Sequence, residues 1–182
     1  STTSRGVAYQ EAPNLPADRP CKRRILEGTL DARLIALDAN DGKPCADFGA
    51  SGEVSLLAGM GEVHPAMVAV TSPPTIIRGV AVLGHQVLDG QRRDAPSGVI
   101  RGYDALTGEL RWAWDMLRPD LRGLPPAGDQ YSRGTPNSWT IAAGDEALGL
   151  VYLPMGNSAA DYYNGSRREP ENRYSTAIVA LD

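Results

Sequence analysis

The chain has 182 residues, of which 42% are hydrophobic and 22% charged, and its formal net charge is −4. This length allows one domain of ordinary size with a real core. The chain is acidic and has no basic block, which argues against nucleic acid as a partner. No apolar run approaches the ~18 residues that a membrane span needs. The first ten residues do not have the pattern of a signal peptide. The chain is therefore compatible with a mature or excised piece of something longer.

Strand signals dominate the sequence, and few windows keep an apolar helical period for three turns. The 20 glycines and 14 prolines favour short strands joined by tight turns. Seven segments rich in β-branched and aromatic residues are the predicted strands: 32–38, 75–84, 98–104, 110–115, 138–143, 148–156 and 175–182. Four long polar segments are predicted loops, and loops of this length are usually functional or disordered: 9–22, 85–97, 117–137 and 157–173.

An apolar strand that ends in aspartate occurs three times, at Asp38, Asp104 and Asp182. The aspartate carboxylate can accept hydrogen bonds from the turn amides that follow it. In the first two copies a glycine stands four residues later, Gly42 and Gly108, and supplies the left-handed backbone that closes the turn. The copies lie further apart than the ~40–50 residues of one four-stranded blade, so the pattern predicts propeller blades with long insertions.

The second copy continues into a strand that carries Trp112, whose large flat side chain can pack between adjacent sheets. We therefore expect Trp112 to dock one blade on the next, without a cofactor role. One such copy is a weak signal, but two copies and a partial third favour an all-β propeller over a β-sandwich.

The chain has two cysteines, Cys21 and Cys45, which is too few for a zinc site, and neither His64 nor His85 stands at ligand spacing from them. Two buried free thiols and one disulfide in an oxidising compartment remain equal alternatives. In the first copy of the repeated phrase, Ala46 stands where the second has tryptophan. A Cys21–Cys45 disulfide would there replace the docking role of the tryptophan.

Eight segments in family order resemble the membrane-bound, PQQ-dependent quinoprotein dehydrogenases of the glucose, quinate and shikimate type. They are "SRGVAY" (4–9), "CKRRI" (21–25), "RLIALDANDGKPC" (33–45), "TSPP" (71–74), "SGVIRGYDALTGELRWAWD" (97–115), "PNSW" (136–139), "LGLVYLPMGN" (148–157) and "RYSTAIVALD" (173–182). The resemblance implies an eight-bladed β-propeller catalytic domain, of which residues 1–182 would form two to three blades.

The resemblance also implies a chemistry. In this family the quinone of PQQ, polarised by a divalent cation such as calcium or magnesium, oxidises a hydroxyl of a sugar or cyclic polyol such as glucose, quinate or shikimate. Electrons pass to ubiquinone at the periplasmic face of the bacterial inner membrane. Membrane attachment would come through segments that this chain lacks.

Four residues match cofactor or metal positions of the family. Trp139 in "PNSW" matches the tryptophan that stacks on the cofactor, and Arg5 in "SRGV" matches an arginine that pairs with a cofactor carboxylate. Asn157 in "PMGN" resembles an asparagine that ligates calcium, and Asp89 falls where glucose-oxidising members carry an acidic residue. Each of three residues also has an alternative without a functional role. Trp139 could be a blade-docking tryptophan, Arg5 a solvated arginine near a frayed terminus, and Asp89 an ordinary loop aspartate.

The chain departs from the family pattern at Ser4 and Ser1, where family members usually carry a cysteine and a PQQ-contacting histidine. The family's catalytic aspartate and its lysine match no residue of this chain, so we assign no catalytic residue. We expect these 182 residues to be inactive by themselves, and marginally stable or self-associating, because isolated blades expose edges and faces.

Two other functions compete with the dehydrogenase. A non-catalytic propeller scaffold that binds protein partners shares the repeated phrase, although such a scaffold does not need "PNSW" and "PMGN". The alternative of a secreted β-sandwich that binds glycans is supported by strand content alone. The two histidines, and the glycosylation-like "NGS" at 164–166, receive no role.

Overall fold

The computed structural model describes residues 4–88, 90 and 92–182 of the chain. Its first sheet is antiparallel with the strand order β1-β2-β3-β4. These strands are β1 (Ala8–Glu11), β2 (Arg23–Gly28), β3 (Arg33–Asp38) and β4 (Glu53–Ser55). Side chains of β2 and β3 alternate between buried and partly exposed, as expected for strands with one face on a core.

The second sheet repeats this architecture, with the order β10-β9-β7-β6 and every neighbouring pair antiparallel. Its strands are β6 (Thr75–Ile77), β7 (Val80–Leu83), β9 (Ile100–Asp104) and β10 (Leu110–Trp114). In both sheets the four strands are therefore neighbours in the order in which the chain makes them, which is the meander of a propeller blade.

The third sheet has three antiparallel strands in the order β11-β12-β13. They are β11 (Ala143–Asp145), β12 (Leu150–Pro154) and β13 (Ile178–Leu181). A two-stranded ribbon and one short helix lie in the connections: β5 (Val68–Ala69), β8 (Gln86–Val87) and α1 (Glu169–Tyr174). Within the described residues, no helix has the length and apolar character that crossing a bilayer requires.

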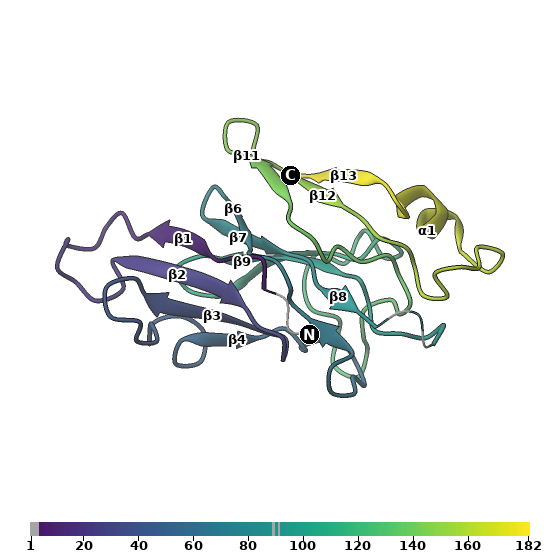
Figure 1. Cartoon of the computed structure of the whole chain (residues 1–182), viewed down its shortest axis with the longest axis horizontal. Helices are drawn as coiled ribbons and strands as arrows, with labels where there is room; N and C mark the ends of the chain where they lie inside the picture. Colours follow the sequence, from purple (N-terminus) through teal and green to yellow (C-terminus); the bar gives the residue numbers. More distant parts are fainter. Residues whose placement is uncertain (1–3, 89, 91) are drawn as a thin grey trace.

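The three sheets lie side by side in chain order, from the purple and blue strands through teal to green and yellow (Figure 1). Their first strands are neighbours, since β6 contacts both β1 and β11. One apolar cluster joins the first two sheets and includes Leu34, Phe48 and Tyr103. A second cluster, which includes Ile100 and Leu153, joins the second and third. The predicted two to three blades are thus two four-stranded sheets and one three-stranded sheet.

The repeated aspartate phrase forms the turn after the third strand of a sheet, as the sequence predicts. The Gly42 amide donates to the Asp38 carbonyl and the Gly108 amide to the Asp104 carbonyl, each at 2.9 Å. Both glycines have positive φ, 73° and 75°, where a side chain would be strained. The Asp104 carboxylate accepts the Leu106 amide at 2.9 Å and so fixes the turn.

Trp112 packs against the cluster between the second and third sheets, in agreement with its predicted docking role. Its indole lies over Gly102 on β9, where an added Cβ would stand 2.5 Å from the ring. Gly102 therefore makes room for the ring that docks the third sheet on the second.

Several predicted boundaries were wrong. The segment 75–84 is a hairpin, because Arg78 and Gly79 both adopt positive φ and reverse the chain between β6 and β7. The segment 138–143 is not a strand, since the Trp139 carbonyl bonds to Thr71 in a distant loop, the Ser138 hydroxyl bonds to Pro154 on β12, and β11 begins only at Ala143. The predicted loops contain β1, β8 and α1, and β2 and β4 were also missed.

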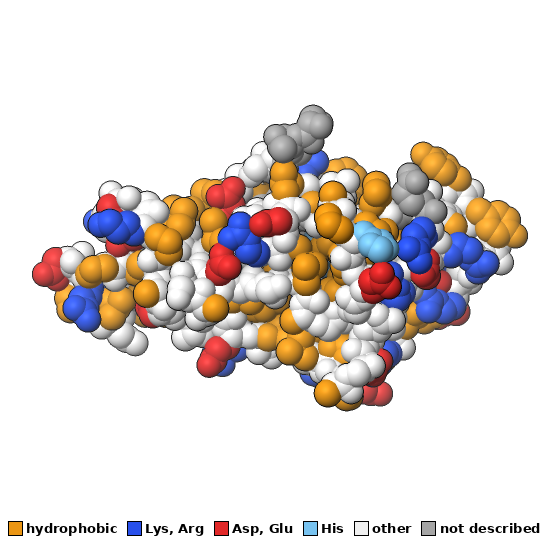
Figure 2. Space-filling view, turned by 90° about the horizontal axis from the view of Figure 1, so that it is seen from below, with side chains coloured by type: hydrophobic (Ala, Val, Ile, Leu, Met, Phe, Trp, Pro, Cys, Tyr) orange, Lys and Arg blue, Asp and Glu red, His pale blue; other side chains and the backbone are white. Residues whose placement is uncertain are grey.

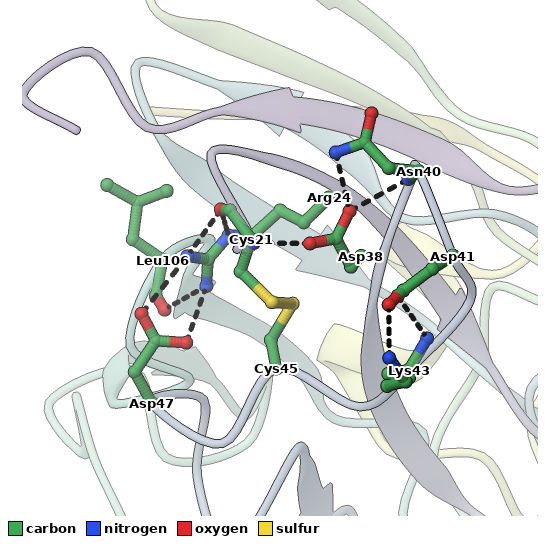
Figure 3. The surroundings of a disulfide bond; sticks show 9 residues. All are labelled: Cys21, Arg24, Asp38, Asn40, Asp41, Lys43, Cys45, Asp47 and Leu106. Carbon is green, nitrogen blue, oxygen red and sulfur yellow. Dashed lines mark hydrogen bonds and ion pairs between the residues drawn. A yellow bond between two sulfur atoms is a disulfide. The ribbon is translucent and has the colours of Figure 1, made fainter. Parts of the chain in front are cut away.

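Cys21 and Cys45 form a disulfide, which decides between the two cysteine alternatives. Figure 3 shows the bond beside two polar anchors that hold the loop before β2. The Cys21 amide donates to the Asp38 carboxylate at 2.6 Å, and this bond lowers the pKa of Asp38. The Cys21 carbonyl accepts from the guanidinium of Arg24, a fully buried side chain that also pairs with Asp47.

Both half-cystines belong to the cluster between the first and second sheets. Trp112 occupies the corresponding cluster between the second and third. This parallel supports the hypothesis that the disulfide takes the place of a docking tryptophan in the first copy of the phrase.

Replacing both cysteines, Cys21→Ser with Cys45→Ser, should lower the free energy of unfolding by about 3 kcal/mol, the typical effect of a disulfide that closes a loop of this length. The two positions are separated by 24 residues. The measurement is urea unfolding of the full-length protein with and without reductant, where reductant should affect only the wild type. Two free thiols per chain at these positions in the unreduced, unfolded wild type would contradict the assignment.

Candidate cofactor and metal site

Three segments of the family-like sequence converge at the main-chain carbonyl of Trp139. The Thr71 hydroxyl donates to this oxygen at 2.7 Å and the Ser72 hydroxyl at 3.0 Å. The Arg5 guanidinium reaches the same oxygen at 3.4 Å and the Thr71 carbonyl at 3.0 Å. The segments around 5, 71 and 139 are far apart in the sequence, so this convergence is built by the packing of the sheets.

Arg5 and Trp139 also contact each other through their side chains. The guanidinium carbon of Arg5 lies 5.2 Å from the centroid of the Trp139 ring, within the range of a cation–π contact. Arg5 is partly buried and hydrogen-bonded, so it is not the solvated arginine of a frayed terminus. Trp139 is 44% exposed, so a large part of its indole is free to receive a flat ligand.

Two glycines leave room for the backbone of the segment that carries Trp139. A Cβ added at Gly98 would stand 1.9 Å from the Pro136 carbonyl oxygen, and one at Gly84 would stand 2.2 Å from that of Ser138. Both distances are far below any real carbon–oxygen contact, so only glycine allows the segment to lie there. The Gly98 amide also donates to the Thr135 hydroxyl at 2.9 Å, and this hydrogen bond joins the same two segments.

Asn157 directly follows Gly156, whose backbone contacts the segment that carries Trp139. The Gly156 amide donates to the Asn137 carbonyl at 2.7 Å, and the Trp139 indole nitrogen lies 3.3 Å from the Cβ position of Gly156. The Asn157 side-chain Nδ2 donates to the Asp161 carboxylate at 2.5 Å. This bond fixes the amide and leaves Oδ1 as the atom that can coordinate a hard cation.

Two of the sequence-predicted positions cannot be placed, because Asp89 and Ser1 lie outside the described residues. Ser4 is described and exposed. The described residues contain one group of three possible metal-binding acids, histidines or cysteines, namely Cys21, Cys45 and Asp47. The disulfide consumes both thiols of that group, so it does not fit a metal site. The donor pair Asn157 and Asp161 fits a hard cation but needs further ligands.

His85 is a buried residue next to Gly84 of the glycine contact. Its Nε2 lies 2.7 Å from the Ser97 carbonyl oxygen, which fixes the tautomer that donates from Nε2. Burial, with a smaller effect of the Arg101 charge, lowers the pKa of His85 to about 4. The hydrogen bond to Ser97 opposes this shift only in part.

Arg101 is itself buried and joins the first sheet to the second. It donates to the Leu56 carbonyl at 2.7 Å and lies over the Tyr131 ring, 5.9 Å from its centroid. Burial raises the pKa of Tyr131 to about 12, so the phenol stays protonated and donates to the Gly123 carbonyl.

Over residues 1–182 the sequence matches the family described as the β-propeller domain of PQQ-dependent glucose, ethanol and alcohol dehydrogenases. The chain belongs to this family. The glycan-binding sandwich is not supported, because the family's domain is a β-propeller.

Two related quinoprotein dehydrogenases indicate the range of the family. The chain is 56% identical over 178 residues to the glycerol dehydrogenase large subunit of Gluconobacter oxydans, covering 98% of this chain and 24% of that protein. It is 42% identical over 169 residues to a quinate/shikimate dehydrogenase (quinone) of Acinetobacter baylyi, covering 92% of this chain and 21% of that protein. The chain thus spans about a quarter of the length of these relatives.

A solved quinoprotein structure confirms the fold. The quinohemoprotein alcohol dehydrogenase of Comamonas testosteroni superposes with a TM-score of 0.61 at 24% identity, covering 99% of this chain and 25% of that one. The predicted β-propeller is confirmed, and the sandwich is excluded.

Sequence reasoning missed three features of the candidate site. It gave no role to Thr71 and Ser72, although "TSPP" was part of the resemblance, and it did not pair Arg5 with Trp139. It also missed Asp161, which lies in a polar loop and is four residues from Asn157. The Asn–Asp spacing was the available signal for that pair.

Gly98→Ala should destabilise the full-length protein by about 2 kcal/mol and weaken any ligand held by Trp139, because the new methyl group collides with the Pro136 carbonyl. Gly123→Ala is the matched control, since nothing lies within 4 Å of its Cβ position. Thermal unfolding of both variants tests this. Equal melting temperatures for the two would show that the backbone contact is not a constraint.

The stability of the protein should fall as the pH falls from about 6.5 towards 4. His85 takes up a proton in the unfolded chain near its ordinary pKa of 6.5, whereas the folded chain resists protonation until about pH 4. The unfolded state therefore binds more protons in this window, and about 2 kcal/mol is lost between pH 7.5 and pH 5. Urea unfolding at the two pH values should show this loss in the wild type and a clearly smaller one in His85→Gln, which retains an N–H donor.

Proposed function

We propose that this chain is part of a single β-propeller catalytic domain of a PQQ-dependent dehydrogenase that oxidises a hydroxyl group of a polyol or sugar. The observation that carries the proposal is the contact of Arg5 with the half-exposed ring of Trp139. PQQ is a flat tricyclic ring with three carboxylates, so it calls for an aromatic platform and a guanidinium close together.

In this proposal Trp139 supports the ring of the cofactor and Arg5 pairs with one of its carboxylates. The hydroxyls of Thr71 and Ser72 hold the backbone of Trp139 and so set the height of the platform. When bound, PQQ supplies the quinone that accepts the hydride of the substrate. The acid–base residue would come from a part of the protein outside these 182 residues.

Asn157 is the proposed ligand of a divalent cation, calcium or magnesium, through its Oδ1 atom. Asp161 supports this role because its carboxylate holds Nδ2 and so orients the amide. Asp89 is proposed as a second ligand from its place in the sequence. Amide and carboxylate oxygens are the donors that these hard cations prefer.

A polyol is the favoured substrate class. The relative with 56% identity is named a glycerol dehydrogenase, and the one with 42% identity acts on quinate or shikimate by its name. We therefore rank an open-chain polyol above the cyclic polyols and glucose that the sequence resemblance suggested.

We further propose that electrons pass to ubiquinone and that the protein works at the periplasmic face of the inner membrane. The Cys21–Cys45 disulfide supports this compartment, because structural disulfides persist in oxidising surroundings.

The test is reconstitution of the full-length apoprotein with PQQ and calcium or magnesium. Binding should produce the near-ultraviolet absorbance of the cofactor, followed by dye reduction with glycerol in preference to glucose or quinate. Trp139→Ala should weaken PQQ binding by about tenfold to a hundredfold, since it removes the platform, and Arg5→Gln by about tenfold.

Tyr162→Ala is the control variant, because this aromatic side chain is fully exposed and should not affect PQQ. Failure of the full-length protein to bind PQQ would instead support the non-catalytic scaffold. Dye reduction by residues 1–182 alone would contradict the assignment of the catalytic residue to another part of the protein.

A further inference from the structure

An arginine-lined cavity of about 940 Å³ lies between the connections β8–β9, β10–β11 and β12–β13. Its walls come from residues 93–94, 129–134, 158–159, 166–168 and Glu171. Neither Arg5 nor Trp139 lines it, so it is distinct from the candidate platform for the cofactor. We name it the arginine cavity.

The charges of the arginine cavity do not balance. Each of its three acids is neutralised by an arginine, in the ion pairs Asp94–Arg92, Asp129–Arg118 and Glu171–Arg168. The remaining lining arginines have no acidic partner among the described residues: Arg93, Arg133 and Arg167. The cavity therefore carries positive charge that an anion can neutralise.

Two polar atoms on the cavity wall are buried and lack a partner within the described part of the chain. They are the hydroxyl of Ser158, a residue that is only 2% exposed, and Nε of Arg167. Arg167 uses Nη2 to donate to the Asp161 carbonyl at 2.9 Å, which orients its guanidinium and leaves Nε without an acceptor. A buried donor without an acceptor is costly, so both atoms favour a ligand that accepts hydrogen bonds.

Arg133 is braced as a rigid part of the wall. It donates to the Asp94 carbonyl at 2.8 Å and to the carbonyls of Met60 and Glu62 at 3.2 Å. Its own carbonyl accepts from Arg168 at 3.0 Å. Carbonyls hold the guanidinium, and the nearby Asp94 carboxylate already pairs with Arg92, so most of the Arg133 charge remains available to the cavity.

We propose that the arginine cavity binds a phosphate group, held by Arg167, Ser158 and the charge of Arg133 and Arg93. The unpaired arginines come from three separate segments, and a tetrahedral phosphate offers acceptor oxygens in several directions, whereas a carboxylate offers two in one plane. Figure 2 shows Lys and Arg side chains gathered at the right-hand end of the molecule.

The test is calorimetric titration of the full-length protein with inorganic phosphate at constant ionic strength. Arg167→Gln should raise the dissociation constant about tenfold, because it removes a charge-assisted donor. Ser158→Ala should raise it about threefold and leave the melting temperature of the phosphate-free protein unchanged, since its hydroxyl has no partner to lose among the described residues.

Arg122→Gln is the charge-matched control, because Arg122 is exposed and does not line the cavity. Sedimentation with phosphatidylcholine vesicles that contain phosphatidylglycerol identifies the source of the phosphate. Vesicle binding that Arg167→Gln and Ser158→Ala weaken assigns a lipid headgroup, and its absence assigns a soluble phosphate compound.

The proposal is overturned if phosphate does not bind at millimolar concentration, or if Arg122→Gln weakens it as much as Arg167→Gln. It is also overturned if Arg167→Gln lowers PQQ affinity and not phosphate affinity, because the cavity would then belong to the cofactor site. Since PQQ binding is measured separately, a failure of the proposed dehydrogenase function is distinguishable from a failure of the phosphate site.

Discussion

The candidate site depends on the close approach of the backbone at 136–139 to two glycines of the second sheet. Gly84 and Gly98 stand at the inner ends of the long connection between β7 and β9, and a side chain at either would displace a carbonyl of this segment. The contact brings Trp139 under the hydroxyls of Thr71 and Ser72, which come from the connection between the first and second sheets. Arg5 then reaches the same carbonyl from the segment that precedes β1. The platform is thus a product of how three sheets meet.

Two buried arginines maintain this arrangement from opposite directions. Arg24, on β2, donates to the Leu106 carbonyl in the last turn of the second sheet at 2.7 Å. Arg101, on β9, donates to the Leu56 carbonyl just after the first sheet, also at 2.7 Å. Each charge is buried, so separating the two sheets would remove a buried hydrogen bond from each guanidinium. The disulfide beside Arg24 adds a covalent link to the same region.

The sequence predicted the features whose chemistry is local. Asp38 and Asp104 close their turns through neighbouring amides, so the phrase could be recognised from a few consecutive residues. The hairpin within 75–84 was missed because Arg78 adopts positive φ, a conformation that its residue type does not signal. The segment 138–143 is rich in strand formers, but its hydrogen bonds go to a distant loop and to β12 through the Ser138 side chain, which periodicity cannot show. The contact between Arg5 and Trp139 is likewise non-local, and family resemblance named both residues without placing them together.

Asp161 connects the candidate metal ligand with the arginine cavity. Its carboxylate holds the Asn157 amide, and its main-chain carbonyl holds the Arg167 guanidinium. Both donors lie on the connection between β12 and β13, and Ser158 of the cavity wall follows Asn157 directly. A cation on Asn157 and an anion on Arg167 would therefore share one loop and attract each other. Because the two bound charges would be opposite, each ligand should favour the other, and this coupling must be equal in both directions.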